Sequence, residues 1–491
     1  MHGQTDRDVR TSPSAAAARS PLARLVRRPG WWLIVVATAY TVTMIVTVRH
    51  LPLGSDEALY ASQLSPRAPA LTWSAARSRG ITFVTAPVVA FTGAPTALRS
   101  YLAVVSGVAL VVAYWPWLRA VRRPGTVPVA ALLFAGLWTA LMYGASDMPN
   151  IWIAFTAVAA TGWFVRYGQR PGLGPALGVA IGVAVGALLR PSDAAWTTAT
   201  LLAAILLVRR WRRLPLLAAV LGGAVVGVAD WVVEAYLRYG GLTSRMHQAD
   251  AQQGGLGWYP DTVGYQLRVL DGPLLCRPCD TGPLAHPHTW VTAAWWLAIP
   301  PLVVVALVVA FRRRELAGYA LPAVVGAVAG LSYLVGLDYA APRFLLPSYA
   351  LLALPVASLL VALPLAVPGR PRPVVVGVLV VLFALHEAAQ LGTLTDRVDR
   401  PDVPAMAAAR LHQVGVRQPC LLFGVRRTQI AYRLGCDAEP FHGQRIRTDR
   451  QQVVFLTWYP NGRRFGPDWR RYELPRPPHG RRWYAFLAPT P

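Results

Sequence analysis

The sequence predicts an all-α polytopic membrane bundle of about 11 helices, followed by a small α/β domain outside the membrane. Three observations support this fold class. Hydrophobic residues make up 54% of the chain and charged residues 14%, with a mean hydropathy of +0.39, which is too apolar for an ordinary soluble enzyme. Long apolar segments recur along the chain between arginine-rich turns. In residues 392–491 this pattern is absent, and short segments typical of strands appear instead.

The apolar segments are the candidate membrane spans. A helix that crosses a bilayer needs about 20 mostly apolar residues. Segments of roughly this length occur at residues 31–48, 98–118, 127–143, 150–166, 173–189, 194–208, 214–233, 289–311, 317–336, 345–367 and 373–391.

The charges predict how these spans are oriented. All 48 basic residues are arginines. With the N-terminus inside, the inner segments carry 20 arginines and the short outer segments 7. Because basic residues accumulate on cytoplasmic loops, we expect a multi-pass plasma-membrane protein with a cytoplasmic N-terminus and an extracytoplasmic C-terminus. The same bias explains the formal net charge of +25 without a nucleic-acid partner. Of 23 acidic residues, only Asp6, Asp8 and Glu315 lie inside, which indicates a functional surface on the outer face.

The chain therefore divides into three parts. We expect residues 1–30 to be a disordered cytoplasmic segment and residues 31–391 to be the transmembrane domain. That domain has two large outer loops, 49–97 and 234–288, and the first contains an apolar piece at 81–93 ("ITFVTAPVVAFTG") that is too short to span and is predicted to lie in the interface.

Residues 392–491 are predicted to form the extracytoplasmic α/β domain. "CLLFGV" (420–425) is typical of a strand, "RRTQIAYRLG" (426–435) of a helix that ends at a glycine, and "QQVVFLTWYP" and "RRWYAFLAP" of returning strands. Strand–helix–strand order favours two layers. The cysteines (Cys276, Cys279, Cys420 and Cys436) all face outward in this topology, where thiols usually form structural disulfides. Of three possible pairings, Cys276–Cys279 with Cys420–Cys436 is the most local.

Polar residues at outer helix ends are the candidate site. Asp56 and Glu57 follow the first span in "LPLGSDEALYASQ" (51–63). Later outer turns add both acids and arginines: Asp147 in "YGASDMPN", Arg190 and Asp193 in "LRPSDAAW", and Asp338, Tyr339 and Arg343 in "LDYAAPRFLLPSY". Short loops on one side of a bundle converge on a small area, and this mixture is suited to holding a phosphate and moving a proton.

These segments resemble the GT-C superfamily of membrane glycosyltransferases, especially its branch of protein O-mannosyltransferases and lipid A aminoarabinose transferases. The resemblance rests on "DEALY" after the first span, the segment 81–93, "SDMPN", "RPSDA" and "PRFLLPSYALLALP", and it covers residues 31–367. The family's His-Pro-Pro before the interfacial helix is absent, and "RSRGITF" (77–83) stands in its place. The resemblance implies transfer of a sugar from a polyprenyl-phosphate donor to an acceptor on the outer face.

The resemblance also implies roles for individual residues. Asp56 matches the family's general base, which takes the acceptor's hydroxyl proton. We expect Glu57 to orient Asp56 or to raise its pKa through like-charge repulsion. Arg343 and Arg190 are candidates to hold the leaving phosphate, with Arg79 as a third. Tyr339, Asp147 and Asp193 complete the predicted substrate site.

Several of these residues have simpler alternatives. Arg190 is also placed to extend toward lipid headgroups. Asp193 and Asp147 are placed to cap the helices that follow them, and Asp147 could instead bind a metal ion with Asp56. A divalent metal ion is compatible with several carboxylates near a phosphate, but no ligand spacing demands one. No other cofactor is indicated.

The predicted partners are a polyprenyl-phosphate-linked sugar, membrane lipids, and an acceptor glycan, lipid or protein. The alternative function is a transporter or flippase of lipid-linked or small anionic substrates. Transport pathways usually place charges near the middle of the bilayer, whereas here the polar residues gather at one rim.

Overall fold

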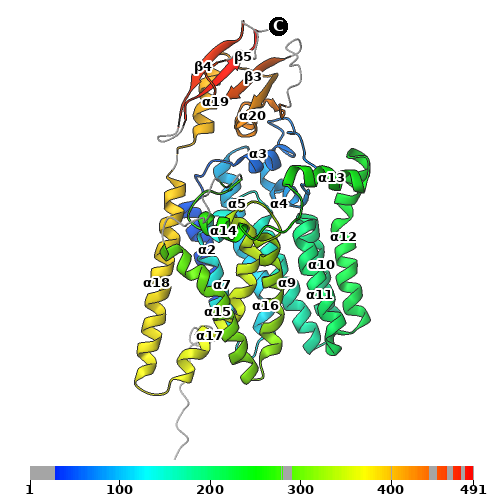
Figure 1. Cartoon of the computed structure of the whole chain (residues 1–491), viewed down its shortest axis with the longest axis vertical. Helices are drawn as coiled ribbons and strands as arrows, with labels where there is room; N and C mark the ends of the chain where they lie inside the picture. Colours follow the sequence, from blue (N-terminus) through cyan, green and yellow to red (C-terminus); the bar gives the residue numbers. More distant parts are fainter. Residues whose placement is uncertain are drawn as a thin grey trace, which may run out of the picture.

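The structure is a computed structural model that describes residues 28–277, 279, 290–399, 401–441, 451–461, 468–476 and 481–489. A helical bundle lies below a layer of short helices, and a small sheet domain covers that layer (Figure 1). Of the segment predicted to be disordered, residues 1–27 lie outside the described part. The last two residues of that segment, Pro29 and Gly30, already belong to the first helix, α2.

All eleven predicted spans are helical. The helices of the bundle are α2 (Pro29–Thr47), α5 (Pro95–Tyr114), α7 (Thr126–Ala135), α8 (Trp138–Gly144), α9 (Asn150–Gln169), α10 (Leu173–Leu189), α11 (Pro191–Leu207), α12 (Leu214–Arg238), α15 (Trp290–Arg312), α16 (Leu316–Leu334), α17 (Leu346–Ala366) and α18 (Pro371–Val398).

Among the described residues, seven helices are long and apolar enough to cross a membrane: α2, α5 with α6 (Trp117–Ala120), α12, α15, α16, α17 with η2 (Pro342–Leu345), and α18. The predicted span 127–143 is a pair of helices, α7 and α8, bent by 78°. Helices α10 and α11 have 17 residues each. A mostly helical, multi-pass membrane fold is therefore confirmed, while the count of eleven crossings stays a prediction.

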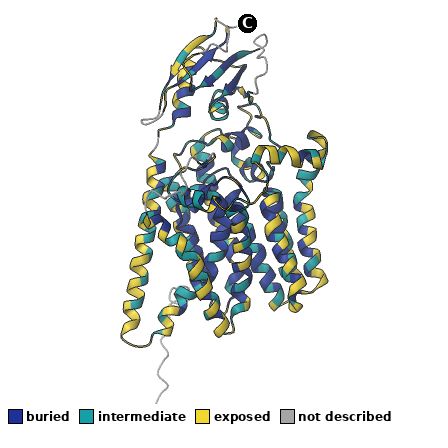
Figure 2. Ribbon diagram, in the orientation of Figure 1, coloured by how far each residue is buried: buried dark blue, intermediate teal, exposed yellow. Residues whose placement is uncertain are grey.

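The distribution of burial fits a bundle surrounded by lipid. Buried residues concentrate in the central helices, and exposed residues follow the outer helices α12 and α18 (Figure 2). On α18 the exposed residues are themselves apolar, among them Val374, Val378 and Leu382. Large exposed apolar surfaces on a helix indicate contact with a membrane rather than with water.

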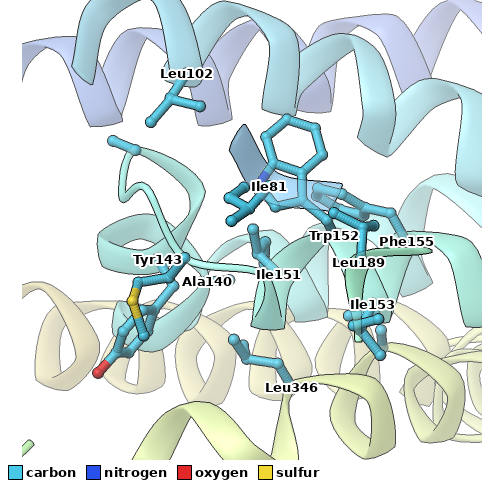
Figure 3. Packing of buried hydrophobic residues seen from close by; sticks show 14 of the residues in the cluster. Ile81, Leu102, Ala140, Tyr143, Ile151, Trp152, Ile153, Phe155, Leu189 and Leu346 are labelled. Atoms are coloured by element: carbon cyan, nitrogen blue, oxygen red, sulfur yellow. The ribbon is translucent and has the colours of Figure 1, made fainter. Parts of the chain in front are cut away.

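The predicted interfacial segment forms α4 (Gly80–Val89), and its first turn is packed into the bundle. Ile81 is fully buried in the cluster that includes Leu102 of α5 and Ile151 of α9 (Figure 3). A Cβ on Gly80 would lie 2.5 Å from the Leu188 carbonyl oxygen, so only glycine permits this approach to α10. The packing fixes the loop before α4, which carries part of the candidate site.

Both outer loops contain helices at the same end of the bundle as the sheet domain. The first loop holds α3 (Ser55–Ser62) and α4, and the second holds α13 (Leu242–Gln253) and α14 (Thr262–Val269) (Figure 1). The second loop begins later than predicted, because α12 continues past residue 234 to Arg238. A bridge between Cys276 and Ala340 ties this loop to the turn after α16.

The C-terminal domain consists of α19 (Val403–Gln413), α20 (Arg427–Leu434) and a five-stranded mixed sheet of order β2-β1-β3-β5-β4. The strands are β1 (Cys420–Gly424), β2 (Asp437–Ala438), β3 (Gln452–Thr457), β4 (Arg470–Leu474) and β5 (Trp483–Leu487). Strands β1 and β3 are parallel and flank the crossover through α20, as strand–helix–strand order predicts.

Residue 392, the predicted start of the extracytoplasmic domain, lies within α18. Helix α18 continues without a break to Val398, because its apolar face gives way to a polar but still helical stretch, "EAAQLGTLTDRV". The α/β domain begins with α19 at Val403. It rests on the first outer loop, where the side chain of Gln429 donates to the Leu53 carbonyl over 3.2 Å.

The structure contains two disulfides, Cys276–Cys279 and Cys420–Cys436. This is the most local of the three pairings. The second disulfide joins the start of β1 to the end of α20 and so closes the crossover of the α/β domain.

Candidate active site

Asp56 lies in the first turn of α3, at the outer end of the bundle. One carboxylate oxygen, Oδ1, accepts a hydrogen bond of 2.6 Å from Nη2 of Arg77. The side chain keeps 38% of its surface exposed, so a substrate can reach it. Helix α3 begins at Ser55, and the amide of the preceding Gly54 donates to Oε2 of Glu57 over 2.7 Å, which closes the first turn of the helix.

Glu57 is not positioned as a partner of Asp56. Its side chain is buried and forms a two-pronged ion pair with Arg99, at 3.1 Å and 3.0 Å. It also accepts a hydrogen bond of 2.9 Å from the backbone amide of Asp147. Arg99 in turn donates to the carbonyl oxygens of Leu51, Pro52 and Ala145. This network joins the first outer loop to the turn after α8.

The environment of Asp56 favours its charged form. Burial raises the pKa of the Asp56 carboxyl, but the guanidinium groups of Arg77, Arg343 and Arg190 outweigh burial and bring the pKa below its ordinary value. The expectation that Glu57 raises this pKa is therefore wrong, because Arg99 engages Glu57 while three arginines surround Asp56.

Asp147 is fully buried, and neither of its side-chain oxygens has a hydrogen-bond partner among the described residues. Burial, followed by the charge of Glu57, raises its pKa well above the ordinary value, against a smaller lowering by Arg99. The predicted cap is not present, because no side chain caps α9. Asp147 thus belongs to the buried network of Glu57 and Arg99, in which Glu57 accepts a hydrogen bond from its backbone amide, and within the described residues it does not face a cavity.

Four arginines converge on a cavity of about 210 Å³ that Asp56 also lines. We call it the arginine cavity; the four are Arg77, Arg190, Arg277 and Arg343. They come from the first outer loop, the α10–α11 turn, the second outer loop and η2. In the part of the chain that the structure describes, Asp56 is the one acidic residue in its lining, and a cavity with this excess of guanidinium groups is suited to a phosphate.

Aromatic rings form one wall of the arginine cavity. Tyr339 and Phe344 line it, with their ring centroids 5.7 Å apart. Arg277 lies over the Tyr339 ring at 4.6 Å, and Arg343 lies over Phe344 at 5.3 Å. These rings hold the guanidinium groups without neutralising them, so the arginine charges remain available to an anion.

Asp193 does not line this cavity and does not cap α11. It is the third residue of that helix, whose N-cap is Arg190. Its carboxylate lies 3.4 Å from Nε of Arg190 and accepts a hydrogen bond from the hydroxyl of Tyr333. Asp193 therefore positions Arg190 instead of contacting a substrate in the cavity.

Arg79 lies outside the arginine cavity. Its Nε and Nη2 donate to Oε1 of Glu234 over 2.9 Å and 2.6 Å, and Arg245 holds the other oxygen of Glu234 at 2.9 Å. This cluster ties the first outer loop to α12 and α13. The arginine of "RSRG" that reaches Asp56 is Arg77, two residues earlier.

Two more cavities reach Asp56. One, of about 330 Å³, lies between the first outer loop and the α/β domain, and we call it the domain cavity; its lining includes Trp73, Arg426 and Arg427. The other, of about 880 Å³, is called the large cavity and is lined by Leu53, Arg343 and Arg426 among others. In the part of the chain that the structure describes, Asp56 is the only residue that lines all three.

The described residues contain no group of three or more His, Cys, Asp or Glu side chains that could hold a metal ion. Asp56 and Asp147 do not share a cavity, because Asp147 lines none of the three. The divalent metal ion therefore stays a prediction without a defined set of ligands.

Sequence reasoning missed Arg77, Arg99 and Arg277. Arg77 and Arg79 flank one serine, and nothing in "RSRG" distinguishes the arginine that faces Asp56 from the one that faces Glu234. In the sequence, Arg99 is one more arginine on the outer side, near the start of α5, and nothing there marks it as the partner of Glu57. Arg277 sits between Cys276 and Cys279, and the disulfide there was the available signal that this segment is held in place.

Comparison with known proteins identifies the fold. No family model matches the sequence, and no curated protein sequence matches it. Among solved structures, ArnT from Cupriavidus metallidurans bound to undecaprenyl phosphate is similar, with a TM-score of 0.63 and 14% identity over 93% of this chain and 98% of that one. Its apo state gives a TM-score of 0.61.

The archaeal oligosaccharyltransferase AglB from Archaeoglobus fulgidus, in complex with an inhibitory peptide and a dolichol-phosphate, is also similar. Its TM-score is 0.54 at 14% identity, over 83% of this chain and 63% of AglB. The fold implied by the resemblance to GT-C glycosyltransferases is thus confirmed.

Proposed function

We propose that this protein is a membrane glycosyltransferase that moves a sugar from a polyprenyl-phosphate donor to an acceptor hydroxyl on the outer face of the membrane. The observation that carries the proposal is the position of Asp56. It stands where the arginine cavity meets two further cavities, so a donor and an acceptor can both reach it. The bound undecaprenyl phosphate of ArnT and dolichol-phosphate of AglB support this class of donor.

In the proposed reaction, the donor phosphate occupies the arginine cavity. Asp56 takes the proton of the acceptor hydroxyl, the hydroxyl oxygen bonds to the sugar's anomeric carbon, and the bond from that carbon to the phosphate oxygen breaks. The electron pair stays with the polyprenyl phosphate, whose added charge Arg343, Arg190 and Arg277 stabilise. A base placed in this way contributes about 10²–10⁴-fold to the rate.

Arg77 has a double role in this scheme. Without a substrate it forms the ion pair with Asp56, and it lines the arginine cavity at the same time. A donor phosphate would compete with Asp56 for this guanidinium group. Donor binding would then release the carboxylate so that it can accept the acceptor's proton.

We propose the orientation predicted from the arginines, with the three cavities on the extracytoplasmic side. The turns between α11 and α12, α15 and α16, and α17 and α18 lie at the opposite end of the bundle from the sheet domain (Figure 1). These turns carry Arg209, Arg312 and Arg370 with their neighbours. A reporter fused after the C-terminus should be active only outside the cytoplasm, and cytoplasmic activity would contradict this orientation.

The test of the function is the Asp56→Asn variant in purified, full-length protein in lipid nanodiscs. Radiolabelled undecaprenyl-phosphate sugars are offered as donors with envelope extract as the acceptor source, and released undecaprenyl phosphate is measured. We expect at least a 100-fold loss of transfer in Asp56→Asn, with undecaprenyl phosphate binding retained. Asp261→Asn, an exposed acid at the start of α14, serves as the matched control. Full transfer by Asp56→Asn would remove the proposal.

A further inference from the structure

The α/β domain contributes two arginines to the surroundings of Asp56. Arg426 and Arg427, at the start of α20, both line the domain cavity, and Arg426 also lines the large cavity. The domain cavity shares Asp56, Ser74, Arg77 and Gln252 with the arginine cavity. A molecule in the domain cavity can therefore reach the base from a cavity that adjoins the donor site.

Arg426 is exposed and Arg427 is half-buried. Within the described ranges, no carboxylate lies within 4.0 Å of either arginine, whereas Arg77, Arg79 and Arg99 each bind one. Nε of Arg427 is buried without a hydrogen-bond acceptor among the described residues, and its Nη1 donates to the Gly424 carbonyl at 3.2 Å.

Arg427 carries the larger cost of burial. Partial removal from water lowers the pKa of both guanidinium groups, and no acidic neighbour in the described part of the chain offsets the effect. A half-buried guanidinium group without an acidic partner is stabilised when an anion occupies the cavity beside it. Among the described residues, the Asp56 carboxylate is the one acid in the lining of the domain cavity, and Arg77 already binds it.

The backbone at Arg426 is also in an unfavourable conformation. Its φ of 54° places it in the left-handed region, which is unfavourable for a residue with a Cβ atom and free of that penalty for glycine. Strained residues persist where the surrounding structure holds them for a function. In this case the conformation turns the chain from β1 into α20 and brings two successive guanidinium groups to the domain cavity.

We infer that the domain cavity is the acceptor site and that Arg426 and Arg427 bind an anionic group, a phosphate, on the acceptor. The inference rests on the proposed function, since it supplies the second substrate of the same reaction. The remaining lining is largely apolar and includes Trp73, a surface against which a sugar ring can stack. The α/β domain would then select the acceptor, while the bundle binds the donor.

The test is binding of radiolabelled glucose 1-phosphate to full-length protein in phosphatidylcholine nanodiscs. Saturating undecaprenyl phosphate is present, so that the arginine cavity is filled and the probe reports on a second site. We expect the Arg426→Gln/Arg427→Gln variant to bind the probe at least tenfold more weakly, and uncharged glucose to bind wild-type protein at least tenfold more weakly than glucose 1-phosphate. Arg410→Gln, an exposed arginine on α19, should bind like wild type.

A second variant guards against a folding defect. Arg426→Gly relieves the left-handed strain, so its thermal midpoint should equal or exceed that of wild type while probe binding falls several-fold. Wild-type affinity in the double variant, or equal affinity for glucose and glucose 1-phosphate, would overturn the inference.

To identify the source of the phosphate, binding of glucose 1-phosphate is measured again in nanodiscs that contain phosphatidylglycerol. Competition by that lipid would assign the site to a lipid-borne phosphate, and lack of competition to the phosphate of a glycan; both support an anionic acceptor. Binding of undecaprenyl phosphate is measured on the same samples. Its absence would contradict the proposed function, whereas intact donor binding with unchanged probe binding in the double variant would contradict only this inference.

Discussion

Replacing Glu57 with glutamine should destabilise the protein far more than replacing its neighbour Asp56 with asparagine. The Glu57 side chain is 8% exposed, its partner Arg99 is 2% exposed, and the two form paired hydrogen bonds of 3.1 Å and 3.0 Å. Removing one member of a buried pair leaves the other charge uncompensated, which costs about 3–5 kcal/mol. Glutamine keeps only one acceptor oxygen, so its NH2 group would also face one of the two backbone donors, the amide of Gly54 or that of Asp147.

The Asp56 pair is different. Its two side chains are 38% and 24% exposed, and such ion pairs contribute about 0–1 kcal/mol after solvent screening. Asp56→Asn should therefore abolish transfer with little loss of stability. Glu57→Gln should lower the free energy of unfolding by several kcal/mol and reduce transfer only through misplacement of α3.

The measurements are equilibrium unfolding in mixed micelles of a mild detergent and dodecyl sulfate, and the transfer assay on the same preparations. The Glu57→Gln/Arg99→Gln double variant completes a cycle and should be destabilised less than the sum of the single changes. If Glu57→Gln unfolds within 1 kcal/mol of wild type and loses transfer as completely as Asp56→Asn, Glu57 takes part in the chemistry and this reasoning is refuted.

Three further outcomes are expected. Arginines bring the pKa of Asp56 below its ordinary value of about 3.9, so the ionised base should persist at acidic pH. Arg77→Gln should therefore move the acidic limb of the pH–activity profile to higher pH. An unmoved limb would speak against Asp56 as the base. Asp147 has a raised pKa in the folded state, so its contribution to stability falls as the pH rises above about 3.9. Asp147→Asn should therefore have a higher thermal midpoint than wild type at pH 8 and lose that advantage toward pH 5, whereas parallel pH curves would contradict the assignment. Finally, Arg343→Gln should weaken undecaprenyl phosphate binding at least tenfold while Arg79→Gln leaves it unchanged, and equal losses in both variants would place the phosphate elsewhere.

Much of the candidate site could be predicted because helices that cross a membrane alternate in direction. Residues 56, 190 and 343 lie far apart in the chain, yet each follows or precedes a span on the same side. Their loops are short and therefore meet near the ends of neighbouring helices. The structure brings these three residues, with Tyr339, to one cavity.

The errors concern residues whose direction depends on packing. Glu57 follows Asp56 directly, and their sequence positions suggest a pair. On a helix, however, consecutive side chains diverge by about 100°, so Glu57 turns inward to Arg99 while Asp56 faces the cavities. Arg77 and Arg79 lie before α4, which begins at Gly80, and their partners Asp56 and Glu234 come from different elements, so their directions are set by tertiary contacts.

Apolar length and the placement of charge along the chain were enough to predict the class of protein, its helical segments and the side of the membrane expected to carry the site. These properties act locally and need no knowledge of contacts between distant segments. Packing between distant segments sets which acid faces the cavities and which is buried against Arg99, and it brings arginines of the α/β domain to the cavity beside Asp56. Those outcomes depend on which buried charges find partners, and partners here are separated by tens to hundreds of residues.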